Sequence, residues 1–236
     1  MPIPDFLPKL ERKSAKLRAF TLLQQWIKNG TFAPGEKISD TELAKALGLS
    51  RTPIREALQM LEMQGFIEMK PGSVTRVTTI EKEDIFKIYP PLAALDAIAA
   101  ETAAEKIDSA TIKILREINQ QFATALMKQK IDEALELDER FHQTILKVAE
   151  NPFLTSFITT LQMHVSRFKY VFLQQPEVNS QRSVEEHEAI LDAFENKNSE
   201  KAGRMIYQNW MRSMTEIVKQ LGKEITLKKD VKLSEE

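Results

Sequence analysis

The stretch that decides the fold of the first third of the chain is SRTPIREAL, residues 50–58. Ser50 suits a helix N-cap, and Pro53 falls in the first turn, where its missing N–H leaves no helical hydrogen bond unmade. The apolar positions that recur at helical spacing on one face are Ile54, Leu58 and Leu61. Arg51 and Arg55 lie one turn apart on another face. The pattern predicts a short helix, anchored along one side, that carries cations into a DNA major groove.

The residues before this helix complete a helix-turn-helix. A first helix is predicted for residues 14–28. A second helix begins near Ser39, which is followed three residues later by Glu42 in the pattern of a capping box. Gly48 stops this helix just before the SRTPIREAL stretch. Two helices joined by a three-residue turn are typical of the DNA-binding helix-turn-helix.

The residues after the third helix predict a β-hairpin. Two short alternating segments, 66–69 and 74–77, flank the turn sequence Lys-Pro-Gly-Ser at 70–73. A hairpin directly after a helix-turn-helix is a wing, and Gly72 stands at its tip. We therefore expect a winged helix-turn-helix domain over residues 14–78.

Helical periodicity dominates from residue 81 to residue 222. The predicted helices are separated by short breaks and cover residues 81–106, 109–128, 131–149, 152–173, 180–196 and 199–221. Pro90-Pro91 is expected to kink or break the first of them. The expected fold class is mainly α: a winged helix-turn-helix domain followed by an all-α antiparallel bundle of six or seven helices. Residues 1–13 are expected to be a flexible lead and residues 223–236 a flexible tail.

Composition limits the classes of function. The 236 residues include no cysteine, which excludes disulfides and thiolate metal sites and agrees with a cytoplasmic protein. No apolar run approaches the roughly 20 residues that a membrane span needs. Residues 1–80 hold 12 Lys and Arg against 8 Asp and Glu, whereas the remainder is net negative. A basic N-terminal domain favours a polyanionic partner such as DNA.

The run SDTELAKALGLSRTPIREAL at 39–58 resembles the DNA-binding domain of the GntR superfamily of bacterial transcription regulators. The helical remainder resembles the FCD ligand-binding domain of the FadR branch through DERFH at 138–142, NPFL at 151–154 and EHEAIL at 186–191. The resemblance implies a homodimeric repressor or activator that binds a pseudo-palindromic operator in double-stranded DNA, and of the two we expect a repressor. It also implies that residues 81–222 bind a small-molecule effector and form the dimer.

Six residues match DNA-contacting positions of that family, and the resemblance implies the same role here. They are Thr41, Ser50, Arg51, Thr52, Arg55 and Gly72. Guanidinium groups read guanine edges or hold phosphates, and hydroxyls at a helix N-terminus also hold phosphate. A glycine at the wing tip admits close approach to the minor groove. Many relatives carry an Arg where Thr41 stands. From the residues alone, the alternative is that the arginines are solvated surface cations and that Ser50 only caps its helix.

A second candidate site lies in the helical domain. Asp138 and His142 are four residues apart on one helix face, and His187 lies on a later helix. A carboxylate and imidazoles that converge inside a bundle suit Zn²⁺, Ni²⁺ or Mn²⁺. The resemblance to metal-binding FCD domains implies an Asp and three His as ligands, and the third His would stand at Asn209. Three interpretations stay open: a metal with Asn209 or water as fourth ligand, weaker metal binding, or an effector bound without metal.

The effector itself is not encoded in a simple motif. Members of the family commonly hold a carboxylate effector with an Arg early in the first long helix, and the matching position here is Leu92. Four other arginines are candidates to replace it: Arg140, Arg167, Arg182 and Arg204.

The rival function from another class is a metal-dependent enzyme, or a metal sensor, built on the helical domain. Glu139 or Glu186 would be the general base of such an enzyme. No recognisable catalytic motif supports it, and an N-terminal winged helix has no role in it. We therefore expect a regulator and not an enzyme.

Overall fold

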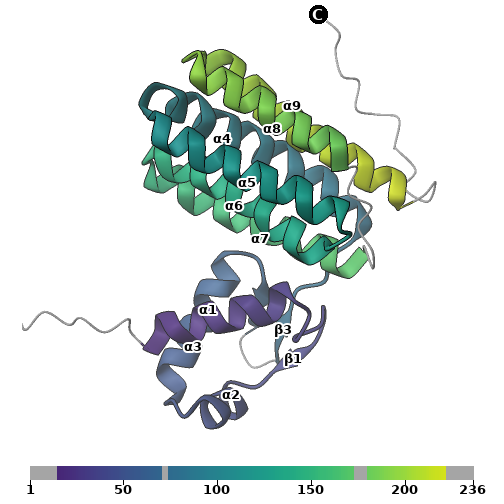
Figure 1. Cartoon of the computed structure of the whole chain (residues 1–236). Helices are drawn as coiled ribbons and strands as arrows, with labels where there is room; N and C mark the ends of the chain where they lie inside the picture. Colours follow the sequence, from purple (N-terminus) through teal and green to yellow (C-terminus); the bar gives the residue numbers. More distant parts are fainter. Residues whose placement is uncertain (1–14, 71–73, 173–179, 222–236) are drawn as a thin grey trace, which may run out of the picture. The chain divides into compact units, whose positions relative to one another are not determined.

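The structure, a computed structural model, describes residues 15–70, 74–172 and 180–221 (Figure 1). The chain divides into two compact units, Met1–Ile80 and Glu81–Glu236. Each unit has buried apolar side chains of its own.

Several sequence predictions fall outside the described residues. These are the lead at residues 1–13, the tail at 223–236, and Gly72 at the expected wing tip. The loop expected after the helix that ends near residue 173 lies outside them as well.

The first unit is a winged helix, which confirms the expected fold class. Its elements, in chain order, are α1 (Ala15–Lys28), β1 (Lys37–Ile38), α2 (Asp40–Leu47), α3 (Arg51–Met63), β2 (Ile67–Glu68) and β3 (Thr75–Val77). β3 is the middle strand of an antiparallel sheet, between β1 and β2. We did not predict β1, because two residues are too few for alternation to show. It is a strand only because Lys37 and Ile38 pair with Arg76 and Thr75.

Helix α3 is fixed through its apolar face. Ile54, Leu58 and Leu61 are fully buried, as predicted. Helix α1 packs against α3 and buries Leu23 and Ile27. Burial of each such side chain stabilises the fold by roughly 1.5–3 kcal/mol. This anchoring leaves the other side of α3 free to serve a partner.

The second unit is an all-α bundle, again as expected. After a single 3-10 turn, η1 (Lys82–Asp84), its helices are α4 (Ile85–Lys106), α5 (Ser109–Met127), α6 (Ile131–Ala149), α7 (Pro152–Phe172), α8 (Ser180–Glu195) and α9 (Ser199–Gln220). Helix α4 packs against α6, α7 and α9, and α5 packs against α6 and α8. Figure 1 shows these long helices side by side. In the described part of the chain, no helix combines the length and apolar character that a membrane span requires.

Helix α4 runs without interruption through Pro90 and Pro91, so a break at this point is wrong, whereas a kink stays a prediction. Each proline lacks the N–H that would bond the carbonyl one turn earlier. Tyr89 and Leu92, on either side of the pair, are fully buried. We attribute the continuity of α4 to the packing of these side chains, which offsets the missing hydrogen bonds. Asp96 therefore lies on the same helix that begins at Ile85.

Candidate functional site

The N-terminal end of α3 presents the predicted DNA-binding residues to solvent. Ser50 stands at the N-cap with extended backbone angles, φ −72° and ψ 163°, and within the described residues its hydroxyl makes no capping hydrogen bond. Arg51, Thr52 and Arg55 are exposed. The hydroxyls of Ser50 and Thr52 and the helix N-terminus thus face solvent together, which is the chemistry of a phosphate site.

Arg51 is held by an acid from the neighbouring helix, a contact that we did not predict. Its Nη2 donates to Oδ1 and Oδ2 of Asp40, the first residue of α2, at 3.2 and 2.9 Å. The bond from Arg51 is the main reason that the pKa of Asp40 lies below its usual value. Among the described residues Arg51 has no second partner, and Arg55 has no partner. Asp40 thereby fixes the direction of one of the two candidate base-reading cations.

The remaining predicted DNA contacts come from α2 and from the wing. Thr41 is exposed at the start of α2, and its Oγ1 donates to Oδ1 of Asp40 at 3.3 Å. Gly72 lies outside the described residues. Arg76 on β3 is exposed and donates from Nη1 to the carbonyl oxygen of Gly35 at 3.2 Å. The return strand of the wing therefore adds a further cation to this unit.

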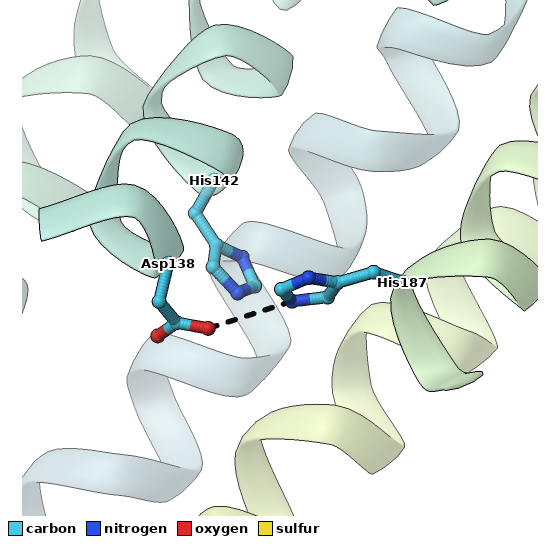
Figure 2. A group of neighbouring side chains, drawn as sticks. All are labelled: Asp138, His142 and His187. Carbon is cyan, nitrogen blue, oxygen red and sulfur yellow. Dashed lines mark ion pairs between the residues drawn. The ribbon is translucent and has the colours of Figure 1, made fainter. Parts of the chain in front are cut away.

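The three strongest metal-ligand candidates converge in the second unit. Helix α6 supplies Asp138 and His142, and α8 supplies His187; one ligand atom from each lies within 4.8 Å of the others. Oδ1 of Asp138 lies 3.5 Å from Nε2 of His187. Figure 2 shows the carboxylate and the two imidazoles directed toward one another. Both histidines are buried, whereas a quarter of the Asp138 side chain is exposed.

His187 is oriented by an amide on α5. Nδ1 of His187 lies 3.0 Å from Oδ1 of Asn119. The amide nitrogen of Asn119 donates to the carbonyl of Val184 and to Oε1 of Glu188, at 3.2 and 2.7 Å. Oδ1 of Asn119 is therefore the acceptor, and Nδ1 of His187 carries the proton. The ring also stacks on Phe141, with centroids 4.0 Å apart.

This orientation leaves a buried lone pair on Nε2 of His187. Among the described residues this nitrogen has no hydrogen-bond partner. Burial is the main cause that lowers the pKa of His187 to about 3, so the ring is neutral at pH 7. A neutral imidazole whose free nitrogen faces a carboxylate is the form that binds a metal ion.

His142 is oriented by a carboxylate on α4. Its Nδ1 lies 3.1 Å from Oδ2 of Asp96, and the same oxygen accepts from Nε1 of Trp210 at 2.7 Å. Burial acts to lower the pKa of His142, but the hydrogen bond and charge of Asp96 outweigh it, so the pKa is raised. Because Asp96 occupies Nδ1, the atom left for a metal is Nε2. A carboxylate behind a metal-binding histidine is a recurrent arrangement in metalloproteins.

Asn209 forms a hydrogen bond with a residue outside this cluster. It is buried on α9, and its amide nitrogen donates to Oε2 of Glu186 at 2.9 Å. Glu186 in turn accepts from Nε of Arg212 at 2.6 and 2.7 Å. The carbonyl oxygen is therefore the only atom of Asn209 with which it can act as a ligand.

The spacing of Asp138 and His187 fits a divalent ion. Two ligand atoms at about 2.1 Å from one tetrahedral ion lie about 3.4 Å apart. The separation of 3.5 Å between His187 Nε2 and Asp138 Oδ1 agrees with that figure. Two imidazoles and one carboxylate suit Zn²⁺, Ni²⁺ or Mn²⁺.

The arginines proposed as effector anchors lie in different environments. Arg140, Arg182 and Arg204 are exposed. Arg167 is buried, and burial lowers its pKa. Leu92, where the resemblance expects an arginine, is fully buried in the core.

A cation that we did not predict, Lys169 on α7, interacts electrostatically with the cluster. Burial lowers the pKa of Lys169, and the charges of Asp138 and Glu139 oppose that shift. Lys169 therefore acts electrostatically on a candidate metal ligand. Nothing in its local sequence sets it apart from the other lysines.

Comparison with known proteins decides the family. The sequence profile of the gntR family of bacterial regulatory proteins matches residues 15–77, and that of the FCD domain matches residues 87–211. The chain belongs to the GntR family. The GntR profile spans the winged helix, and the FCD profile spans most of the helical bundle.

Relatives of this GntR-family chain are transcriptional regulators. It is 28% identical to the HTH-type regulator YdhC of Bacillus subtilis, over 79% of this chain and 83% of that one. It is 24% identical to the HTH-type repressor RspR of Escherichia coli, over 87% and 89%. The families and relatives are regulators and not enzymes, so the rival interpretation as an enzyme is excluded. The chain is a DNA-binding transcriptional regulator of the GntR/FCD type.

Solved structures share the fold of this GntR-family chain. McbR/YncC of E. coli matches with a TM-score of 0.74 at 20% identity, over 89% of this chain and 99% of that one. A GntR regulator from Rhodococcus sp. RHA1 matches with a TM-score of 0.65 at 19% identity, over 88% and 99%.

Replacing Asp40 by asparagine is expected to reduce the sequence specificity of this GntR-family regulator. Loss of one negative charge near the candidate DNA-binding end should tighten binding to random duplex DNA. Operator binding should not gain equally, because Arg51 loses its fixed direction. We expect the ratio of the two affinities to fall about fivefold, or about 1 kcal/mol, in fluorescence anisotropy titrations. Glu56→Gln removes the same charge from α3, and an equal fall in that control would contradict the role of Asp40.

Proposed function

We propose that this regulator controls its operator through a small carboxylate effector, which binds a divalent metal ion held by Asp138, His142 and His187. The observation that carries the proposal is the buried, unpartnered Nε2 of His187, 3.5 Å from Oδ1 of Asp138. A buried nitrogen without a partner is unfavourable, and coordination to a metal removes that penalty.

Three protein ligands leave room in the coordination sphere for an effector. A bound divalent ion would supply Lewis acidity to a carboxylate oxygen. Asn209 offers at most a neutral oxygen, because its amide nitrogen is bonded to Glu186. Lys169, which is electrostatically coupled to Asp138, adds a cation that would favour an anionic effector.

We propose further that the second unit forms a homodimer and that the two winged helices read a pseudo-palindromic operator. Ser50, Arg51, Thr52 and Arg55 would contact the major groove and its phosphates, with Thr41 and Gly72 beside them. Recognition helices in such dimers lie about one helical turn of DNA apart, so a small change in their separation greatly weakens binding. A repressor role is supported by the E. coli relative RspR, which is an HTH-type transcriptional repressor.

The metal should stabilise the folded chain. An ion at 100 times its Kd that binds only the folded state adds about 2.7 kcal/mol of stability. For a chain of this size the melting temperature should rise by about 5–10 °C. Calorimetry of chelator-treated protein, before and after addition of Zn²⁺, Ni²⁺ or Mn²⁺, tests this. If the melting curve after addition of each of the three ions is identical to that of the chelator-treated protein, the metal assignment is overturned.

The regulatory part of the proposal needs a DNA measurement. An operator duplex can be selected from a random duplex library with the purified chain. Anisotropy titrations of that duplex are then repeated with a panel of small mono- and dicarboxylates, with and without the metal. We expect at least one carboxylate to change operator affinity tenfold or more, and only in the presence of metal. An effect of the same size after chelation would show that the effector acts without the ion.

A further inference from the structure

Asp96 is a carboxylate buried where the sequence is otherwise apolar. It is 1% exposed and shares the buried stripe of α4 with alanines at positions 93, 99, 100 and 103. It is also the only charged residue between Ile88 and Ala100. Burying a carboxylate costs several kcal/mol unless it is well bonded, so its place in this stripe requires a physical reason.

The bonds of Asp96 join three helices at one oxygen. Oδ2 accepts from Nε1 of Trp210 on α9 at 2.7 Å and lies 3.1 Å from Nδ1 of His142 on α6. Oδ1 has no hydrogen-bond partner among the described residues. A carboxylate oxygen can only accept, so Oδ2 is an acceptor toward both neighbours. Nδ1 of His142 must then carry its proton toward α4.

We propose that Asp96 is a positioning residue for the metal site: it holds His142 with Nε2 toward Asp138 and His187, and it ties that histidine to α4 and α9. This inference rests on the proposed metal site. A carboxylate behind a ligating histidine fixes its tautomer and increases its strength as a ligand, and loss of such a partner lowers metal affinity 10–100-fold.

The two ligating histidines differ in this respect. His187 has a neutral amide, Asn119, at its Nδ1, whereas His142 has a carboxylate. Among the described residues, Nδ1 of His142 therefore contacts a charged group on another helix, whereas Nδ1 of His187 contacts a neutral one. The ring of His142 also lies 4.8 Å from that of Trp210. A change at His142 is thus passed to the indole both through Asp96 and by direct ring contact.

Trp210 makes the proposal measurable. The chain has two tryptophans, so Trp26→Phe leaves Trp210 as the sole indole emitter. In that background we expect Zn²⁺ alone to change the emission of Trp210 and to give a binding curve. Asp96→Asn should weaken Zn²⁺ binding 10–100-fold and reduce the emission change at saturation. Glu101→Gln, which removes the same charge from an exposed position on α4, should bind Zn²⁺ as the parent does.

The outcomes separate this inference from the proposed function. Equal Zn²⁺ affinity in Asp96→Asn and in the parent would overturn the role of Asp96 and leave the metal site standing. Failure of the parent to bind any of Zn²⁺, Ni²⁺ and Mn²⁺ would overturn both. If Asp96→Asn does not fold, nitrogen-15 spectra of the histidines in the Zn²⁺-loaded unaltered chain decide the matter. We expect His142 to be protonated at Nδ1, and a proton at Nε2 would contradict the proposal.

Discussion

Alanine at both Arg51 and Arg55 is expected to weaken operator binding by about 4 kcal/mol, or roughly a thousandfold. Each arginine that reads a base edge or phosphate contributes about 1–3 kcal/mol, and about 4 kcal/mol is the sum of two contributions from the middle of that range. Both arginine side chains are exposed at the N-terminal end of α3. When the arginines are replaced, the buried Ile54, Leu58 and Leu61 still hold the helix in place. The loss should therefore appear in DNA binding and not in thermal stability.

The control for this prediction is a second double variant, Lys16→Ala with Arg18→Ala. It removes two positive charges from α1 instead of α3. We expect it to lower affinity for operator and random duplex DNA by a similar small factor, because it affects only non-specific attraction. Anisotropy titrations at fixed salt compare the two double variants. If both lose operator affinity equally, α3 does not enter the groove.

Asp138→Asn and His187→Ala are each expected to abolish high-affinity metal binding. A structural zinc site supplies about 10–16 kcal/mol through four ligands, so one ligand is worth about 3 kcal/mol, or more than a hundredfold in Kd. Asp138→Asn is the sharper variant, because it preserves side-chain shape at a position that is a quarter exposed. Isothermal titration with Zn²⁺ measures the effect.

His164→Gln is the matched control for the metal ligands. It removes the one histidine of the sequence that is not in the cluster, which lies on α7. We expect His164→Gln to bind Zn²⁺ with wild-type affinity. Only the ligand variants should lose the control of operator affinity by carboxylates. Zn²⁺ binding by Asp138→Asn at wild-type affinity would place the ion elsewhere in the chain.

The parts of both sites that depend on short spacings could be predicted from the sequence. The SRTPIREAL stretch places an apolar face and two arginines within nine residues. In the structure the apolar face is buried and both arginines are exposed. Asp138 and His142 share a helix face because they are four residues apart. Spacing alone could not place His187 beside them, because it lies 45 positions after His142. That prediction depended on the resemblance to FCD domains.

The partners of those residues could not be predicted in the same way. Asp96 approaches His142 across 46 positions, and Asn119 approaches His187 across 68. The sequence did hold a signal for Asp96, which is the single charge in a long apolar stretch. Asn119 and Asp40 had no such signal, because polar residues on α5 and at the start of α2 are ordinary.

The sequence by itself determined the fold class, the family and the face of α3 that meets solvent, because helical periodicity, caps and turns act over a few residues. Only the tertiary structure decided the state of the histidines, the continuity of α4 through Pro90-Pro91, and the bonding of Asn209 to Glu186. These depend on burial and on contacts between helices that are distant in the chain. The acceptor that orients an imidazole, and the packing that offsets a missing hydrogen bond, exist only once the bundle has formed.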